Sequence, residues 1–261
     1  MTDLLPHIVA LLFVAAVLAG FIDAIAGGGG LIAIPAMLLA GVPPLEALGT
    51  NKLSAQFGAA SATLSYARKG HVRLREQYPM ALTAIAGGAL GALAAALVPP
   101  DVLRATMPLL LIAIGLYFAF RPNLGDTDRR RRVSQFVFGL TVVPLIGFYD
   151  GIFGPGTGSF FMLAFVSLAG FGLLKATAHT KLLNLGSNFG AFLVFVATGS
   201  VLWKLGIVMA AGQILGAQLG SRLAMRNGAK VIRPLLIVSC LAMAVRLLID
   251  PANPLHAALG F

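Results

Sequence analysis

The sequence predicts an all-α integral membrane protein with about ten transmembrane segments. Its 261 residues are 58% hydrophobic and 11% charged, and the mean hydropathy is +0.91. A soluble domain carries about 25% charged residues, so this chain lacks the polar surface that such a domain needs. Apolar runs recur along the whole length and leave no room for a sizeable soluble domain.

The apolar segments are separated by glycine, proline and charged residues. In order they cover residues 4–25, 31–41, 46–67, 79–98, 102–120, 134–153, 158–171, 174–198, 203–222 and 231–249. Most reach the roughly 20 residues that a helix needs to cross the hydrocarbon core. The second and seventh are shorter and follow glycine-rich stretches, as do the broken helices at transporter binding sites. The first lacks a basic region at its start, so we interpret it as a mature helix and not as a signal peptide.

Two stretches of the chain resemble one another. Residues 20–30 read GFIDAIAGGGG, and residues 147–158 read GFYDGIFGPGTG. A lysine follows each stretch inside an apolar segment, Lys52 in the first copy and Lys181 in the second. Lysines within a membrane are costly and usually functional, so the repeat indicates both the architecture and the site.

The repeat extends over most of the chain. Residues 87–92, for example, resemble residues 212–217. These matches follow a common order and predict two five-helix units, 1–120 and 134–261, joined by a charged linker at 121–133.

Loop charges predict how the two units are related. The loop at 68–75 is basic, whereas its counterpart at 198–204 holds only Lys204. The next loop reverses this bias, because 98–101 holds no base and its counterpart at 222–233 holds four. By the positive-inside rule the equivalent loops lie on opposite sides, which predicts inverted repeats, a cytoplasmic linker and both termini outside. Re-entrant short segments would place the bases of 222–233 outside, so ten crossings fit better.

The two glycine runs form a candidate anion site. Each precedes a short helix, where backbone N–H groups and the helix dipole favour a negative charge. A single run would indicate a tight turn or close helix packing, but two at equivalent positions favour binding. The candidate residues here are Gly28, Gly29, Gly30, Gly156, Thr157, Gly158 and Ser159.

The lysines are the second part of the candidate site. A lysine at the bilayer centre costs about 2.5–3.5 kcal/mol, so Lys52 and Lys181 should face a cavity or a partner. The alternative is snorkelling to the interface. Neutral hydrogen-bonding groups accompany them: Asn51, Gln56, Thr180, Asn184 and Asn188. Asn184 and Asn188 share a helix face with Lys181, which suggests a polar stripe along a path.

Three titratable residues lie beside these groups. Asp23 and Asp150 precede the glycine runs and could cap the next helix, pair with a lysine or carry a coupling proton. His179 could titrate during transport or make a simple hydrogen bond.

Other chemistry is not expected. Cys240 is the only cysteine, which excludes an intrachain disulfide and a cysteine-cluster metal site. The glycine runs are not nucleotide-binding motifs, and no nucleophile stands beside a base, so we expect no enzyme, cofactor or metal. The net charge of +10 lies in short loops that orient helices and meet anionic lipid, so nucleic acid is not an expected partner.

The chain resembles the sulfite exporter TauE/SafE family of membrane permeases, also called TSUP. The resemblance covers essentially the whole chain and rests on residues 20–30, Pro35, residues 49–52 and the second copy at 147–181. The second copy departs from the first where Pro155 and Thr157 replace glycines and His179-Thr180 replaces Thr50-Asn51. The resemblance implies export of sulfite or organosulfonates such as sulfoacetate across the bacterial plasma (inner) membrane.

The resulting hypothesis is a secondary transporter that works by alternating access, with an anion site at the repeat interface. A passive anion channel, or a carrier for another small organic anion, is the alternative. The expected partners are a small anionic substrate, membrane lipid and a coupling ion, either proton or sodium. A homodimer is an open alternative.

Overall fold

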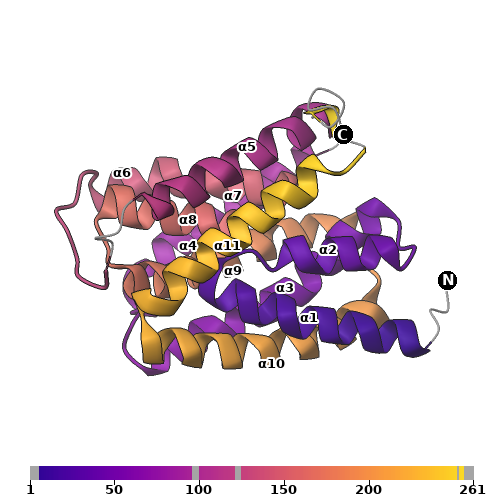
Figure 1. Ribbon diagram of the computed structural model, residues 1–261, viewed down its shortest axis with the longest axis horizontal. Helices are drawn as coiled ribbons and strands as arrows, with labels where there is room; N and C mark the ends of the chain where they lie inside the picture. Colours follow the sequence, from indigo (N-terminus) through magenta and orange to yellow (C-terminus); the bar gives the residue numbers. More distant parts are fainter. Residues whose placement is uncertain (1–5, 96–99, 121–124, 252, 256–261) are drawn as a thin grey trace.

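The computed structural model describes residues 6–95, 100–120, 125–251 and 253–255, which form a helical bundle without strands (Figure 1). The first half holds α1 (Pro6–Ala26), α2 (Gly30–Leu39), α3 (Pro44–Arg68), α4 (Leu74–Ala94) and α5 (Pro100–Ala119). The second half holds α6 (Gln135–Val137), η1 (Phe138–Val142), α7 (Val143–Ile152), α8 (Thr157–Ala164), η2 (Phe165–Ala169), α9 (Leu173–Ala197), α10 (Trp203–Asn227) and α11 (Ala229–Leu248). The π-helical turn η1 joins α6 to α7, and η2 extends α8.

The helices confirm an all-α integral membrane protein. In the part of the chain that the structure describes, four helices are long and apolar enough to cross a bilayer: Pro6–Ala26, Gln135–Ile152, Leu173–Ala197 and Ala229–Leu248. Large apolar side chains also point away from the bundle, as Leu39, Phe120 and Phe136 do at 83%, 77% and 75% exposure. Such a surface suits contact with lipid and not with water.

The sequence-based segment limits agree with the helices to within a few residues at most ends. The segment expected at 79–98 begins earlier, at Leu74, because the polar turn Leu74–Tyr78 continues the helix beyond the apolar run. Its expected end at 96–98 lies outside the described residues. The segment expected at 203–222 continues to Asn227 for the same reason. Polar ends of this kind carry no hydropathy signal.

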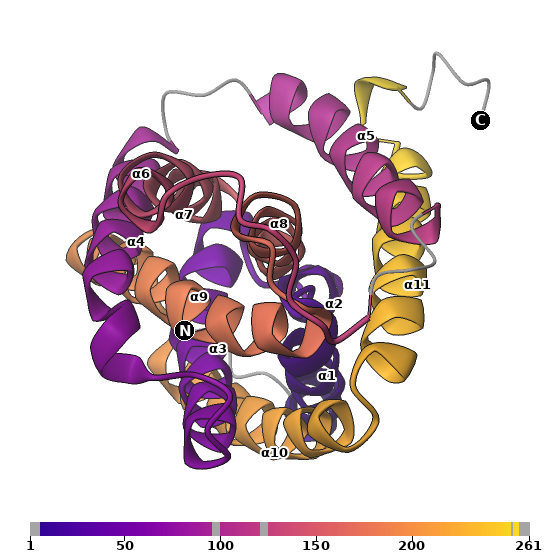
Figure 2. The same cartoon turned by 90° about the vertical axis from the view of Figure 1, so that its left-hand side faces the viewer.

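Helices of the two halves pair with one another. α1 packs along α10, and α4 packs along α7. α3 and α9 contact each other at the centre. α3 also packs on α10, and α9 also packs on α4. α5 and α11 form a separate pair at one side of the bundle (Figure 2). Arg233 of α11 ties this pair together, because its guanidinium donates to the carbonyl oxygens of Phe118 and Ala119.

Glycines set the register of these pairs. A Cβ atom at Gly87 would lie 2.3 Å from the carbonyl oxygen of Pro144, and one at Gly216 would lie 1.9 Å from that of Val17. Val17 and Pro144 stand three residues before the two copies of the GF-D motif. The structural counterpart of Gly87 is therefore Gly216, so the match of residues 87–92 to 212–217 was wrong by one helical turn. The glycines of both helices recur every four residues, so a sequence comparison shifted by four residues again places glycine opposite glycine.

The linker gathers several loops at one end of the bundle. Asp126 accepts hydrogen bonds from the backbone N–H groups of Leu174 and Ala229, at 3.0 and 2.9 Å, and thereby holds the starts of α9 and α11. Asp128 accepts from the N–H of Gly172 at 2.9 Å and from Lys175 at 2.5 Å. Partial burial opposes ionisation of Asp128, but these two hydrogen bonds outweigh it and lower its pKa.

Candidate functional site

The two helix breaks contact each other. A Cβ atom at Gly27 would lie 2.4 Å from Cα of Gly158, and one at Gly158 would lie 2.4 Å from Cα of Gly27. Ser159 closes the contact, because its hydroxyl donates to the carbonyl oxygen of Ala26 at 2.9 Å. Any larger residue at Gly27 or Gly158 would force the end of α1 away from the start of α8.

Each break also needs a left-handed glycine. Gly27 has φ +78° and Gly154 has φ +85°, and they stand four residues after Asp23 and Asp150. The N–H of Gly27 donates to the carbonyl oxygen of Asp23 at 3.0 Å, which closes the last turn of α1. The two aspartates therefore occupy the last turn before each break.

Lys52 pairs with Asp150. Its Nζ lies 2.9 Å from Oδ1 of Asp150 and 2.5 Å from the carbonyl oxygen of the same residue. Both side chains are 1% exposed. Thr157, at the start of α8, donates from its hydroxyl to the same Oδ1 at 2.8 Å.

Lys181 pairs with Asp23 in the same manner. Its Nζ lies 3.2 Å from Oδ2 of Asp23 and also donates to the Asp23 carbonyl oxygen. Lys181 is fully buried, whereas Asp23 is 17% exposed. The N–H of Gly29 points at the other carboxylate oxygen at 3.4 Å. Each pair joins the two halves. The first joins α3 to α7, and the second joins α9 to α1.

These pairs lie deep in the bundle. Each lysine is the ninth residue of its helix, about 12 Å along the axis, and the hydrocarbon core is about 30 Å thick. Burial to 1% or less excludes snorkelling, because neither ammonium group reaches the surface. Each pair is neutral as a unit, which removes much of the cost of burying a lone charge.

Unpartnered polar atoms stand beside both lysines. Oδ1 of Asn51 and Oγ1 of Thr180 are buried without a hydrogen-bond partner, and these residues immediately precede Lys52 and Lys181. Oδ2 of Asp150 is also unpartnered. Buried polar atoms are normally hydrogen-bonded, so these three mark positions that a ligand or water would complete.

The remaining predicted residues are placed around this centre. Gly30 starts α2, and a Cβ there would lie 3.4 Å from Nδ2 of Asn51. The carbonyl oxygen of Gly28 accepts from the N–H of Leu31 at 3.1 Å, and Gly156 has φ +81° before α8. These glycines shape the breaks.

The polar stripe on α9 is partly self-satisfied. Asn188 donates from Nδ2 to Oδ1 of Asn184 at 3.1 Å and to its carbonyl oxygen at 2.7 Å, and both residues are buried. Gln56 is half-buried and makes no hydrogen bond to the described residues. Gln56 lies on α3, outside this stripe, and is the least engaged of the predicted neutral polar side chains.

His179 lies on the linker side of the lysines. Its Nδ1 is 2.9 Å from the carbonyl oxygen of Lys175, and its ring packs edge-on against Phe165 and Phe171. It lines a cavity of about 180 Å³ together with Arg73, Glu76, Gln77, Arg131 and Lys175. Its lining also includes apolar residues such as Met80 and Phe138, and two of its basic residues are paired, Arg73 with Glu76 and Lys175 with Asp128.

Sequence reasoning missed three polar residues of this region. Gln77 donates to the carbonyl oxygen of His179 at 2.8 Å, and its buried Oε1 is unpartnered. It stands two residues before the expected start of the fourth segment at 79, where the sequence predicts a loop. Tyr66 and Tyr149 donate from their hydroxyls to the carbonyl oxygens of Ala24 and Pro155, at 3.0 and 2.7 Å, and so brace the breaks. The position of Tyr149 inside the repeated motif was the available signal.

Among the residues that the structure describes, no group of three or more His, Cys, Asp or Glu side chains could hold a metal ion. A helical bundle with discontinuous helices, buried charge pairs at the breaks and apolar outer faces defines a membrane transporter. The comparison with known proteins agrees: residues 12–247 match the family model of the sulfite exporter TauE/SafE, and the chain belongs to this family.

Its relatives carry transporter names without a substrate. The chain is 66% identical over 260 residues to a probable membrane transporter protein of a Sinorhizobium species, and the match covers 100% of both chains. It is 49% identical over 248 residues to a protein of the same description from Haemophilus influenzae, covering 95% of this chain and 97% of the relative. An Escherichia coli relative, YfcA, is 49% identical over 245 residues, with 94% and 91% covered. No solved structure matches the chain significantly.

Proposed function

We propose that this protein is a secondary transporter that exports small sulfur-containing anions, sulfite or organosulfonates such as sulfoacetate, across the bacterial plasma (inner) membrane. The anion binds between the two halves, where the helix breaks meet. The two halves act as inverted repeats and rock to expose this position to each side in turn.

The observation that carries the proposal is the pair of reciprocal Lys–Asp contacts. Lys52 and Lys181 each form an ion pair with an aspartate of the other half, beside a helix break. Beside them stand the side-chain amide of Asn51 and the hydroxyl of Thr180, whose Oγ1 has no hydrogen-bond partner. The lysine ammonium groups, the amide N–H groups of Asn51 and the Thr180 hydroxyl are donors, as the three oxygen atoms of a sulfonate or sulfite require.

Charge balance supports coupling to protons. A free anion brought to a neutral, buried pair would leave a net negative charge in a low-dielectric site. Protonation of the aspartate removes this excess, because the lysine then has the anion as its partner. Asp150 has a carboxylate oxygen without a partner, Oδ2, that can take this proton. Movement of bisulfite, a monoanion, with one proton is electroneutral, whereas the dianion sulfoacetate with one proton still carries one net negative charge.

The two pairs are not identical. Asp150 is held by Lys52 and Thr157 and is 1% exposed, whereas Asp23 is 17% exposed and lies at the longer distance from its lysine. This difference favours the Lys181–Asp23 pair as the one that opens first.

Counterflow in proteoliposomes tests the proposal. Vesicles preloaded with unlabelled sulfoacetate should accumulate labelled sulfoacetate, and malonate, which replaces the sulfonate by a carboxylate, should exchange much more slowly. Exchange of malonate alone would contradict the sulfur assignment. Flux that does not depend on trans substrate and does not saturate would instead indicate a channel. Empty liposomes and the Lys52→Ala/Lys181→Ala variant are the controls.

A further inference from the structure

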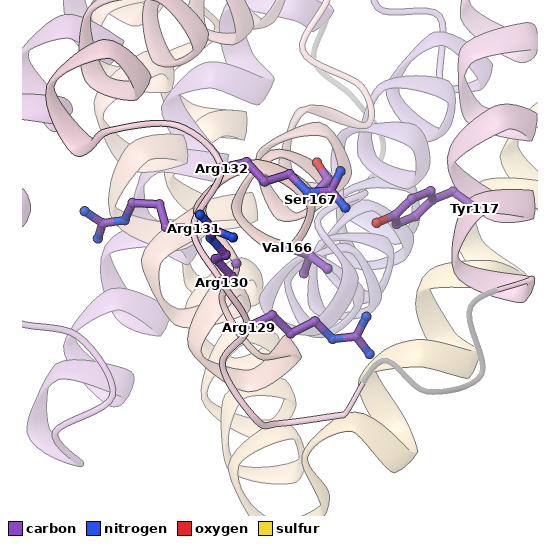
Figure 3. Close-up of a pocket in the computed structure, with 8 residues that line it drawn as sticks. Tyr117, Arg129, Arg130, Arg131, Arg132, Val166 and Ser167 are labelled. Atoms are coloured by element: carbon purple, nitrogen blue, oxygen red, sulfur yellow. The ribbon is translucent and has the colours of Figure 1, made fainter.

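A second, larger cavity lies at the end of the bundle that holds the linker. It measures about 610 Å³ and lies between α5, the linker and η2 (Figure 3). The side chains of Arg129 and Arg132 extend toward Tyr117, as Figure 3 shows, and Arg130 lies between them. We call this cavity the arginine pocket. Neither the transport site nor the repeat uses it.

The positive charge of the arginine pocket is not neutralised within the protein. Arg130, Arg131 and Arg132 make no ion pair with any residue in the described part of the chain. The two acids of the linker face elsewhere: Asp126 binds the starts of α9 and α11, and Asp128 binds Lys175. Arg131 extends away from Tyr117 in Figure 3, so the unpaired guanidinium groups of Arg130 and Arg132 are the ones available to an external anion in this pocket.

The linker holds these arginines in a fixed conformation. The N–H of Arg129 donates to the carbonyl oxygen of Gly170 at 2.6 Å, and the N–H of Arg132 donates to that of Leu168 at 2.9 Å. The N–H of Val133 donates to the same Leu168 oxygen at 3.3 Å. Anchoring at both ends fixes the backbone that carries the guanidinium groups, which lowers the entropy lost on binding.

The pocket combines a cationic rim with an apolar wall. Val166 of η2 forms part of its apolar lining, and the half-buried hydroxyl of Ser167 donates to the carbonyl oxygen of Leu163 at 2.6 Å. The rim lies at helix ends, so it is at the membrane surface whichever side the linker faces. A ligand with an anionic head and an apolar body fits such a place, because basic pockets between helices at this level bind phospholipid headgroups.

We propose that the arginine pocket binds a phosphate-bearing anion, supplied as the headgroup of an anionic phospholipid. The phosphodiester accepts the planar guanidinium donors of Arg130 and Arg132, while an acyl chain lies along α5 and η2. Because the linker joins the two halves, an occupied pocket fixes the linker against η2. The inference does not depend on which anion is transported.

The test measures lipid binding to the delipidated full chain in detergent, by thermal shift and native mass spectrometry. Phosphatidylglycerol should stabilise the protein and phosphatidylcholine should not. Arg130→Gln/Arg132→Gln should weaken the binding of phosphatidylglycerol by about fivefold for each arginine removed. Arg130→Lys/Arg132→Lys keeps the charge but not the planar donors, so it should lose less.

The matched control is Arg68→Gln/Lys69→Gln, which removes two exposed charges from another loop. It should change binding by less than twofold, and an equal loss in this variant would overturn the proposal, since the effect would then be general surface charge. Unchanged binding in the Gln variant of the pocket would overturn it as well. Inorganic phosphate is the second probe: stabilisation by phosphate with no effect of phosphatidylglycerol would overturn the lipid as the source.

Discussion

Two buried lysine residues carry the proposed transport chemistry. Each is buried to 1% or less and lies against both the carboxylate and the backbone carbonyl oxygen of an aspartate in the other half. The carbonyl contact persists whether or not the aspartate is ionised. Protonation of the aspartate therefore weakens each pair without releasing the lysine entirely, which suits a group that must exchange partners within the membrane.

The first prediction concerns Asp150→Asn, which imitates the protonated carboxyl. Without anion, Lys52 is left buried and unpaired, so the free energy of unfolding should fall by about 3–5 kcal/mol. Sulfoacetate at about 100 times its dissociation constant should restore about 2.7 kcal/mol. Melting temperature in detergent, with and without sulfoacetate, measures both effects, and counterflow in this variant should no longer respond to a proton gradient.

The double variant Lys52→Met/Asp150→Asn separates charge from packing. With both charges removed it should be more stable than Asp150→Asn alone, yet gain nothing from sulfoacetate. The exposed pair Arg73–Glu76, whose side chains are 78% and 64% exposed, is the control and should change stability by less than about 1 kcal/mol on removal. Stabilisation of the double variant by sulfoacetate would remove Lys52 from the site.

The lysines could be predicted from the sequence because a lysine stands out in an apolar run. Their partners could not, since Asp150 is 98 residues from Lys52 and Asp23 is 158 residues from Lys181. Pairing with a lysine was one of three roles open to each aspartate. Only the packing of the two halves against each other shows that both aspartates take this role. Gln77 was missed for a different reason, because it lies in a polar turn without hydropathy signal.

At the scale of helices, glycine controls how closely the halves approach. Gly91 of α4 and Gly220 of α10 would each place a Cβ on the carbonyl oxygen of the partner helix, at 2.0 Å from Phe148 and 2.4 Å from Phe21. Hydropathy predicts where these helices run, because apolar length is written in the sequence. It does not fix their register, since the glycine spacing of four residues fits two adjacent turns equally well.

The second prediction concerns Gly91→Ala, which should lower the free energy of unfolding by about 1–3 kcal/mol. The added methyl group meets backbone, which cannot rotate away as a side chain can. Gly115→Ala on α5 is the control, because its Cβ would meet side chains and not backbone, Leu241 at 3.1 Å and Cys240 at 3.5 Å, and it should have little effect. Melting temperatures of the two variants give the comparison, and equal losses would show that backbone approach at α4 is not limiting.

Across the whole molecule, equivalent loops lie at opposite ends of α3. The loop at Lys69 follows the last residue of α3, whereas the loop at Ser200 lies at its start: the N–H of Leu202 donates to Oγ1 of Thr50 at 3.0 Å. α3 has 25 residues and is about 38 Å long, which exceeds the roughly 30 Å hydrocarbon core. The inverted-repeat topology remains a prediction from the loop charges, and this geometry makes it directly testable.

The third prediction is that cysteines at these two loops react from opposite sides of the membrane. Lys69→Cys and Thr127→Cys should be labelled by an impermeant maleimide only from the cytoplasm, and Thr198→Cys only from outside. The native Cys240 is buried, so the unsubstituted protein should give no background and serves as the control. All three replaced side chains are exposed, and none contributes to a buried pair. Labelling of Lys69→Cys and Thr198→Cys from the same side would rule out inverted repeats. The two lysine–aspartate pairs could then not be opened in turn by rocking one half against the other.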